Sequence, residues 1–263
     1  MEIFIKKDGR LGNNLFQYFF GKILAQETNS NLYTNFTLPE LFGLQTNFQF
    51  SPFPNSCGLE EEWNNDDYVL KFNGKEIDKN IEIIIENLKI SNCEKLFVSG
   101  YYQNFDFYEK YTDMIKGSFK CTFGYVSDTL GIHVRKDDIT NSVCDLPDEW
   151  FLQMVEKFPK HKKYVTSDSP NCKLVKKLID LGCELYHDTP ENTIQKFAGF
   201  SDLVLSQGTF SWWMAFLSKG KNHFLIPKTG WNSESAPQKL LPKLENWFYY
   251  KLDEHSQITN VGY

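Results

Sequence analysis

The segment LGIHVRKDD at residues 130–138 indicates both the fold and the place of a functional site. Its first part, Leu130–Val134, is apolar apart from one histidine and predicts a buried strand. A guanidinium and two carboxylates follow directly, so the strand would carry a cluster of charges at its carboxyl end. Ligands bind at the carboxyl ends of the strands in parallel α/β sheets. The segment therefore predicts an α/β unit with a charged ligand site at this strand end.

Arginine is rare in this chain. Of 28 basic residues, only Arg10 and Arg135 are arginines. A planar guanidinium can donate to two oxygens of a phosphate or carboxylate at once, which a lysine ammonium does less well. Both arginines are therefore candidates for binding an anionic ligand. The alternative for Arg135 is a structural ion pair with Asp137 or Asp138.

The composition is that of a globular protein with one large or two modest domains, because 263 residues with 41% hydrophobic content can bury a sizeable core. A net charge of -6 argues against nucleic acid as a partner, since that would require a basic face. The chain shows neither an apolar run of the ~20 residues that span a bilayer nor a signal-peptide pattern at its start. We expect a cytoplasmic protein, soluble or peripheral to a membrane; its oligomeric state stays open.

Cysteine and aspartate spacing speaks against a metal site. The six cysteines have no CxxC spacing, so they are expected to be reduced thiols and not zinc ligands or a disulfide framework. The sequence also has no Asp-x-Asp triplet that would bring a divalent cation to a nucleotide diphosphate. We therefore expect no metal and no other cofactor.

The second half of the chain alternates predicted strands and helices, which is typical of a parallel sheet with helices on both faces. The predicted strands are Leu130–Val134, Lys163–Thr166, Glu184–Tyr186, Asp202–Leu205 and His223–Ile226. The predicted helices are Pro147–Phe158 with Asp145 as its cap, Asn171–Leu181, Glu191–Phe200 and Phe210–Leu217. The strand ends would form one rim of the sheet, made of residues 133–138, 167–168, 187–188 and 206–211.

The first half begins in the same way and then becomes irregular. Its predicted elements are the strand Glu2–Ile5, a glycine-containing turn over 8–14, the helix Leu15–Gln26, a strand over 31–36, the helix Lys75–Leu88, the strand Leu96–Ser99 and the helix Phe105–Tyr111. Prolines and glycines interrupt the pattern over 38–80 and predict a loop-rich insertion or lid. The simplest division places one Rossmann-like unit in residues 1–122 and a second in 123–263.

Two turns before predicted helices could bind an anion, because helix N-termini present free N–H groups and a positive dipole end. The first, Gly9–Asn13, lies after the first strand and contains Arg10; the alternative is a plain tight turn. The second, Leu205–Trp213, offers several hydroxyl groups. For this turn the alternative is that Ser206 or Thr209 only caps the helix. Trp212 and Trp213 are expected to be interior.

Four segments in order resemble the landmarks of glycosyltransferase family 11, the α-1,2-fucosyltransferases. They are GRLGNNLFQY at 9–18, HVRKDD at 133–138, TSDS at 166–169 and GTFSWWMA at 208–215. The resemblance implies a GT-B architecture of two facing Rossmann-like units, with the acceptor on the N-terminal unit and the donor on the C-terminal unit. It also implies a GDP-fucose donor, a glycan acceptor, inversion at the anomeric carbon and no metal requirement.

The same resemblance implies roles for individual residues. Arg135 would hold the donor pyrophosphate with His133 beside it, and Asp138 is the first candidate for the base that takes the acceptor proton, the alternative being that it orients Arg135. The remaining donor-binding residues would be Ser167 and Asp168 at the nucleotide, Thr209, Phe210 and Ser211 on the phosphate side, and Gly9, Arg10, Gly12 and Asn13 across the cleft.

The sequence also departs from the family pattern. Asp137 stands where the family usually has glycine, which affects the geometry of the loop. Residues 37–95 show no match and would carry acceptor specificity. The rival hypotheses are a transferase of the same fold that uses another nucleotide sugar, and a nucleotide- or glycan-binding protein without catalysis.

Overall fold

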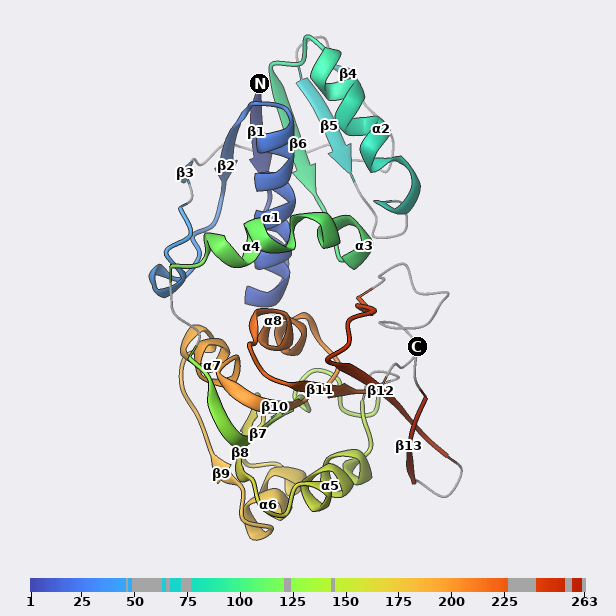
Figure 1. The fold of residues 1–263 in the computed structure, drawn as a ribbon. Coiled ribbons are helices and arrows are strands. Elements are labelled where there is room, and N and C mark those ends of the chain that lie inside the picture. Colours follow the sequence, from blue (N-terminus) through green and yellow to red (C-terminus); the bar gives the residue numbers. More distant parts are fainter. Residues whose placement is uncertain are drawn as a thin grey trace. The chain divides into compact units, whose positions relative to one another are not determined.

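The structure is a computed structural model. It describes residues 1–45, 47–48, 63–64, 67–71, 77–120, 124–142, 145–226, 240–253 and 257–261. The chain divides between residues 120 and 121 into two compact units, each of which is described by itself (Figure 1). This division lies close to the expected boundary between residues 122 and 123. Both units are α/β with largely parallel sheets, so the predicted fold class is confirmed.

Unit 1 contains a six-stranded sheet in the order β3-β2-β1-β6-β5-β4. The strands are β1 (Glu2–Ile5), β2 (Asn31–Thr34), β3 (Asn47–Phe48), β4 (Trp63–Asn64), β5 (Asp67–Lys71) and β6 (Lys95–Ser99). Its helices are α1 (Leu11–Glu27), α2 (Ile77–Ile90), α3 (Phe105–Tyr108) and α4 (Thr112–Ser118), with 3-10 turns at Glu40–Phe42 and Glu109–Tyr111. All neighbouring strands pair in parallel except β4 and β5.

Two expectations for unit 1 were wrong. Asp67–Lys71, inside the expected insertion, forms strand β5 and pairs with β6 in the sheet. The strand was missed because a short DYVLK run between Asn and Gly residues gives a weak periodic signal. Helix α1 begins at Leu11 and not at Leu15, so the turn after β1 is shorter than predicted.

Close packing of α1 on the sheet holds unit 1 together. A Cβ atom at Gly21 would lie 2.6 Å from Cγ1 of Ile5, so glycine lets the helix approach β1 at this point. On the sheet, the ring of Phe4 stacks between those of Tyr33 and Phe97, with centroids 5.1 and 5.0 Å away. These contacts fix the position of β1, from which the first candidate turn leaves.

Unit 2 contains a seven-stranded sheet in the order β13-β12-β11-β10-β7-β8-β9. The strands are β7 (Val126–Val134), β8 (Lys162–Ser167), β9 (Glu184–Leu185), β10 (Phe200–Val204), β11 (Asn222–Leu225), β12 (Trp247–Leu252) and β13 (Ile258–Asn260). Among these described strands, β12 and β13 pair antiparallel and all other neighbours pair in parallel. From β9 to β12, the order is that of the dinucleotide-binding fold, in which the first strand lies between the second and the fourth.

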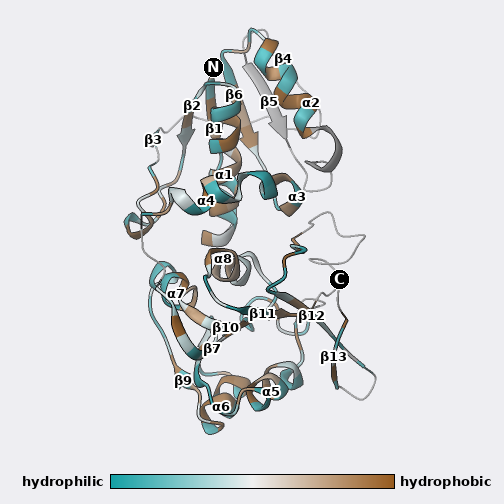
Figure 2. Ribbon diagram, viewed as in Figure 1, coloured by the Kyte–Doolittle hydropathy of each residue, from teal (hydrophilic) through white to brown (hydrophobic). Residues whose placement is uncertain are grey.

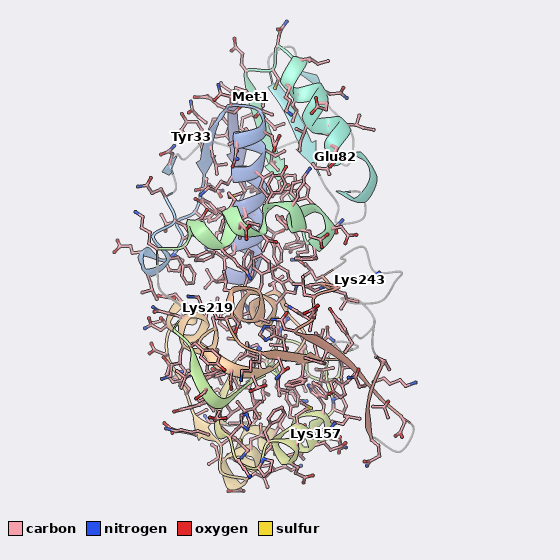
Figure 3. All side chains as sticks on the ribbon, in the orientation of Figure 1. Met1, Tyr33, Glu82, Lys157, Lys219 and Lys243 are labelled. Carbon is pink, nitrogen blue, oxygen red and sulfur yellow. The ribbon has the colours of Figure 1, made fainter. Side chains whose placement is uncertain are left out.

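In its described residues, unit 2 has the helices α5 (Asp148–Lys157), α6 (Lys173–Asp180), α7 (Pro190–Phe197) and α8 (Thr209–Leu217). Figure 1 shows α5 and α6 on one side of the sheet and α7 and α8 on the other. Apolar and polar residues alternate along α5 and α6 (Figure 2), as expected for helices with one buried face. Side chains fill the space between helices and sheet within each unit (Figure 3).

From Thr129 to Val134, strand β7 is buried on both faces. Leu130, Ile132 and Val134 belong to the core cluster that includes Trp150 of α5. Gly131 faces the other side, where an added Cβ would lie 2.7 to 2.8 Å from the side chains of Phe200, Leu203 and Phe197. Because side chains alternate along a strand, the next residue on that second side is His133.

The elements predicted over residues 130–226 are all present, with shifts at their ends. Helix α7 ends at Phe197, and Phe200 already belongs to β10, so the predicted helix over 191–200 was too long. Asp145 is not the cap of α5: the N-cap is Pro147, without a side-chain cap bond. Asp145 instead pairs with Lys136, as described below.

Candidate active site

The candidate site lies at the carboxyl end of the sheet in unit 2, where β7 and β10 are neighbours. The order of the strands reverses between these two, and ligands of doubly wound sheets bind at such a switch point. The segment after β7 carries Arg135 and Asp138, and the segment after β10 leads through Gly208 into α8. The topology thus brings together two segments that the sequence singled out separately.

His133 links β7 to the start of α8. Its ring is buried, and its Nδ1 forms hydrogen bonds with the hydroxyl groups of Ser206 and Ser211, the former at 2.7 Å. The two hydroxyl oxygens lie 3.1 Å apart. Burial, and then the positive charge of Arg135, lower the pKa of His133 to about 3. Near neutral pH the imidazole is therefore uncharged and a weak proton acceptor, which fits a linking role better than proton transfer.

Arg135 forms a bidentate ion pair with Asp138. Its Nε donates to Oδ1 at 2.9 Å and its Nη2 to Oδ2 at 2.8 Å. The structural alternative considered for Arg135 is thus present, with Asp138 as the partner. The pair is partly exposed, 26% for the arginine side chain and 39% for the aspartate, so water still reaches it.

The ion pair leaves an outer edge of the guanidinium for a ligand. Besides the two N–H groups bound by Asp138, Nη1 donates to the carbonyl oxygen of Gln207 at 3.4 Å. An arginine has five N–H donors, so within the described part of the chain one on each terminal nitrogen remains. Two such N–H groups on neighbouring nitrogens can bind two oxygens of a phosphate.

Gly208 allows the arginine to lie against the turn before α8. Its φ is +143°, a conformation that side chains other than glycine rarely adopt. A Cβ atom here would lie 2.9 Å from Nη1 of Arg135. The backbone of this turn and the guanidinium are therefore in close contact because residue 208 is glycine.

The N-terminus of α8 has no side-chain cap. The N-cap is Gly208, and no side-chain bond closes the first turn, so the alternative that Ser206 or Thr209 caps the helix was wrong. Thr209 and Ser211 are buried in that turn, and the ring of Phe210 lies 5.3 Å from that of His133. The N–H groups of a first helical turn and the positive end of the helix dipole favour an anion beside Arg135.

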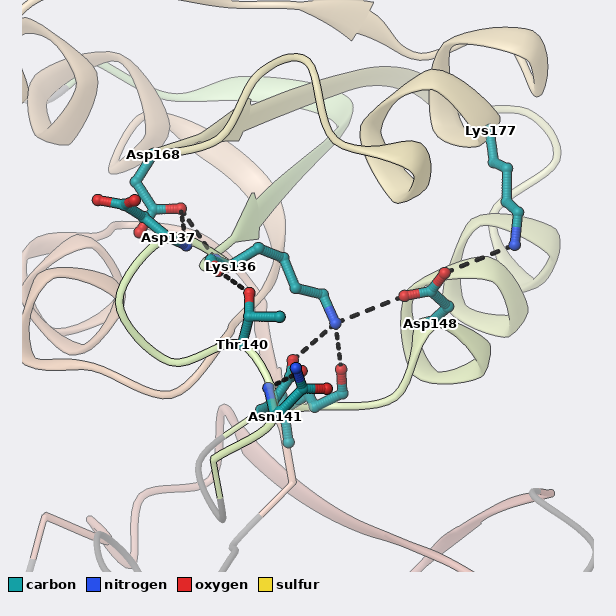
Figure 4. A network of polar contacts seen from close by, with 9 residues as sticks. Lys136, Asp137, Thr140, Asn141, Asp148, Asp168 and Lys177 are labelled. Atoms are coloured by element: carbon teal, nitrogen blue, oxygen red, sulfur yellow. Dashed lines mark hydrogen bonds and ion pairs between the residues drawn. The ribbon is translucent and has the colours of Figure 1, made fainter.

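Asp168, at the end of β8, holds the loop after β7. Its Oδ1 accepts from the backbone N–H of Lys136 at 2.9 Å and from that of Asp137 at 3.3 Å (Figure 4). The hydroxyl of the neighbouring Ser167 accepts from the N–H of Ser169 at 2.9 Å. Both predicted residues thus lie at the same strand edge as Arg135, with contacts that order turns.

Sequence reasoning missed the residues that hold this loop from its other side. Lys136 donates its ammonium group to Asp145 at 2.6 Å, although the pattern had suggested that Asp145 caps a helix. The signal that could have revealed the pair is the spacing of two aspartates, Asp145 before α5 and Asp148 at its start, close in sequence to a strand-end lysine. Ser206 had been considered as an anion-binding hydroxyl or a helix cap but not as a partner of His133, and Gln207 had been placed on the rim without a role.

The remaining predicted residues lie in unit 1, in the turn between β1 and α1. Arg10 is the N-cap of α1 and is exposed, whereas Gly12 and Asn13 belong to the first helical turn. The side chain of Asn14 donates to the carbonyl oxygen of Asp8 at 3.1 Å. The buried amide of Gln17 accepts from the N–H of Asp8 at 3.2 Å.

Further amide contacts tie this turn to the end of β6. Gln17 donates to the carbonyl oxygen of Gly100 at 2.9 Å, and Gln103 donates to Oδ1 of Asn13 at 3.0 Å. Gly9 has a φ of +73°, and a Cβ atom there would lie 2.1 Å from Nδ2 of Asn13. The predicted site residues therefore form two groups, one in each unit.

The described residues contain neither a candidate metal site nor a candidate membrane-spanning helix. No group of three or more His, Cys, Asp or Glu side chains has an arrangement that could hold a metal ion. No helix in the described ranges has the length and apolar character to cross a membrane.

Comparison with known proteins identifies the family. The family model described as glycosyl transferase family 11 matches residues 63–251, which include the loop after β7, Asp168 and α8. The match begins inside the segment 37–95 that had shown no resemblance, and it does not include the turn at Gly9. The structure of E. coli heptosyltransferase WaaC with ADP aligns with a TM-score of 0.43 and 9% identity over 86% of this chain and 87% of that chain. No curated protein matches. Because the family match covers more than half of the sequence, this chain belongs to glycosyl transferase family 11 and is a glycosyltransferase that uses a nucleotide sugar.

Proposed function

We propose that this glycosyltransferase transfers L-fucose from GDP-fucose to a hydroxyl group of a glycan, with inversion at the anomeric carbon and without a metal ion. The resemblance of the four sequence segments to α-1,2-fucosyltransferases supports the choice of sugar. One structural observation carries the proposal: the outer edge of the Arg135 guanidinium lies beside the uncapped N-terminus of α8. This arrangement suits a diphosphate.

The donor diphosphate would bind to two kinds of N–H donor at this strand edge. Nη1 and Nη2 of Arg135 would bind two phosphate oxygens, and the first-turn N–H groups of α8 would bind others. As the bond between fucose and diphosphate breaks, negative charge collects on the leaving phosphate. Donors held in place before the reaction stabilise such charge, with about 3–4 kcal/mol lost when one is deleted in other enzymes.

The proton of the acceptor hydroxyl must be taken by a base or by the leaving phosphate. Asp138 remains a candidate for the base, but both of its oxygens accept from Arg135. This geometry favours the alternative that Asp138 orients the guanidinium. His133 is a poor candidate, because its pKa of about 3 makes it a weak acceptor near neutral pH.

The turn over residues 8–14 of unit 1, for which the resemblance implied donor binding, is proposed to contribute on the acceptor side instead. Its backbone is held by side-chain amides, which order the turn without adding charge. The hydroxyl groups of a glycan are uncharged, so a protein binds them through hydrogen bonds. The acceptor-specific contacts would come from residues 37–95.

The experiment that tests the proposal is incubation with a panel of nucleotide sugars and glycan acceptors in the absence of added metal. We expect transfer from GDP-fucose alone, and NMR of the product should show an anomeric configuration opposite to that of the donor. Transfer from another nucleotide sugar would replace fucose in the proposal. Binding of GDP-fucose with neither transfer nor hydrolysis would instead support a non-catalytic binding protein.

A further inference from the structure

Lys136 lies between the two residues that the proposed mechanism uses most, Arg135 and Asp138. Its ammonium group is held by three acceptors (Figure 4). These are Oδ1 of Asp145 at 2.6 Å, the carbonyl oxygen of Leu146 at 2.8 Å and Oδ1 of Asp148 at 3.4 Å. An ammonium group has three N–H donors, so all of them can be used.

Asp145 closes the loop from its other end. While Oδ1 accepts from Lys136, Oδ2 accepts from the backbone N–H of Asn141 at 3.1 Å. The carboxylate thus contacts both the start and the middle of the segment that follows β7. Asn141 has a φ of +64°, a left-handed conformation in which this contact helps to hold it.

The ion pair of Lys136 with Asp145 is less exposed to water than that of Arg135 with Asp138. The side chains of Lys136 and Asp145 are only 14% and 19% exposed, compared with 26% and 39% for Arg135 and Asp138. Screening by salt weakens exposed pairs most, and removal of one partner of a buried pair leaves an uncompensated charge. Salt should therefore weaken the pair of Lys136 with Asp145 less than the pair of Arg135 with Asp138.

The backbone at Lys136 is held on the opposite side by Asp168, which accepts from its N–H at 2.9 Å. The residue is thus held at its main chain by the end of β8 and at its side chain by the segment before α5. Arg135 and Asp138 flank this doubly held residue along the chain.

We propose that Lys136 and Asp145 are positioning residues that hold the Arg135–Asp138 pair in the geometry that binds and stabilises the donor diphosphate. The inference rests on the proposed function of that pair. Neither residue touches the substrate; each acts through the loop. Displacement of reacting groups by about 1 Å can lower an enzyme's rate about a hundredfold, so a loosened loop is expected to reduce catalysis strongly.

The test compares Lys136→Met with Lys177→Met. Lys177 is a matched control, because its ammonium lies 3.5 Å from Asp148 in the same network but is 55% exposed and lies on α6. For Lys136→Met we expect kcat/KM for GDP-fucose to fall about tenfold to a hundredfold. Calorimetric titration should show a weaker Kd for GDP at a stoichiometry near one. Lys177→Met should match the wild type in both.

The titration separates positioning from a general loss of folded protein. A variant that only unfolds more readily would bind GDP with lowered stoichiometry and unchanged Kd, and this result would overturn the proposal. Asp145→Asn provides a second variant that keeps shape and removes charge. Because the two residues act as one pair, the double variant should lose little more than the worse single variant, whereas additive losses would contradict the pairing.

Hydrogen exchange tests the anchoring without any substrate. In Lys136→Met, the amides of residues 135–142 should exchange faster than in the wild type and in Lys177→Met, because the loop has lost the contacts of the Lys136 ammonium group. Unchanged exchange would overturn the inference. If the wild type transferred no sugar, the proposed function would fail, but the exchange result would still decide whether Lys136 anchors the loop.

Discussion

The two turns that carry the only arginines of the chain are held in different ways. Each follows a central strand of a parallel sheet, β1 in unit 1 and β7 in unit 2. The turn with Arg10 is ordered by neutral amides, chiefly those of Asn14 and Gln17. The segment with Arg135 is ordered by charged groups, through Asp138, Asp168 and the pair of Lys136 with Asp145.

The difference indicates that the two turns are suited to different ligands. Amide contacts hold a backbone in place and leave the local charge unchanged, whereas Asp138 fixes the guanidinium itself and leaves its outer edge for an anion. The charged segment is thus prepared for a diphosphate, whereas the turn that is ordered by amides is proposed to serve the uncharged acceptor. The following predictions test this contrast in order of decreasing effect.

Arg135→Lys should have the largest effect, a fall in kcat/KM of about a hundredfold to a thousandfold, because one ammonium cannot replace the two-pronged donor. Arg10→Lys should cost much less. The thermal midpoint of Arg135→Lys should change little, since a partly exposed ion pair contributes about 1 kcal/mol or less. Steady-state kinetics and thermal unfolding of both variants check this. Near-native turnover of Arg135→Lys would contradict the assignment of this guanidinium to the donor diphosphate.

Gly208→Ala should lower kcat/KM by about tenfold to a hundredfold. The added methyl group meets Nη1 of Arg135, and the φ of +143° becomes strained. Gly9→Ala strains a backbone at +73° in the same way but displaces only the neutral Asn13 side chain. Calorimetric titration with GDP should therefore show weaker binding for Gly208→Ala and little change for Gly9→Ala. Equal losses in GDP affinity would contradict the contrast between the two turns.

Asp138→Asn should weaken GDP binding several-fold and lower kcat about tenfold, because the guanidinium loses the charged group that orients it. Titration with GDP and steady-state rates give the two quantities separately. A fall in kcat with unchanged GDP affinity would show instead that Asp138 is the base. Donor hydrolysis without acceptor should fall together with transfer.

His133 should make the protein sensitive to acid. Its pKa is about 3 in the folded chain and about 6.5 in the unfolded chain, so the unfolded state binds more protons between these values. Stability therefore rises with pH across this window and levels off above it. Between pH 7 and pH 5 the wild type should lose roughly 2 kcal/mol of unfolding free energy from this group. Denaturant titrations of His133→Gln should lack that loss, and an identical pH slope would refute the assignment.

Removal of divalent cations should have the smallest effect. Since Arg135 and the start of α8 can meet the charge of the diphosphate, activity should be unchanged after treatment with EDTA. Transfer assays before and after chelation measure this directly. Strict dependence on Mg²⁺ or Mn²⁺ would mean that the charged segment is insufficient without a metal.

The sequence predicted what depends on local pattern. An apolar run followed by charges was enough to place His133, Arg135 and Asp138 at a strand end, because the carboxyl ends of parallel strands share one edge. The strand–helix alternation likewise predicted the sheet of unit 2. By contrast, the 67–71 strand was hidden by its short length among turn-forming residues.

Local sequence pattern could not predict contacts between segments that are far apart in the chain. Asp145 had the spacing of a helix cap, but its pairing with Lys136 depends on how the loop folds back. The link from His133 to Ser206 and Ser211 depends on the order in which β7 and β10 pair, which periodicity does not reveal. Gly208 was visible as a glycine before a helix, but its contact with Arg135 required the structure.

A crystal structure with bound GDP tests the central claim most directly. The account predicts that oxygens of the diphosphate contact Nη1 and Nη2 of Arg135 and the N–H groups at the start of α8, while Asp138 keeps its two bonds to the arginine. A diphosphate bound at the turn of Arg10, with Arg135 contacting only Asp138, would contradict it.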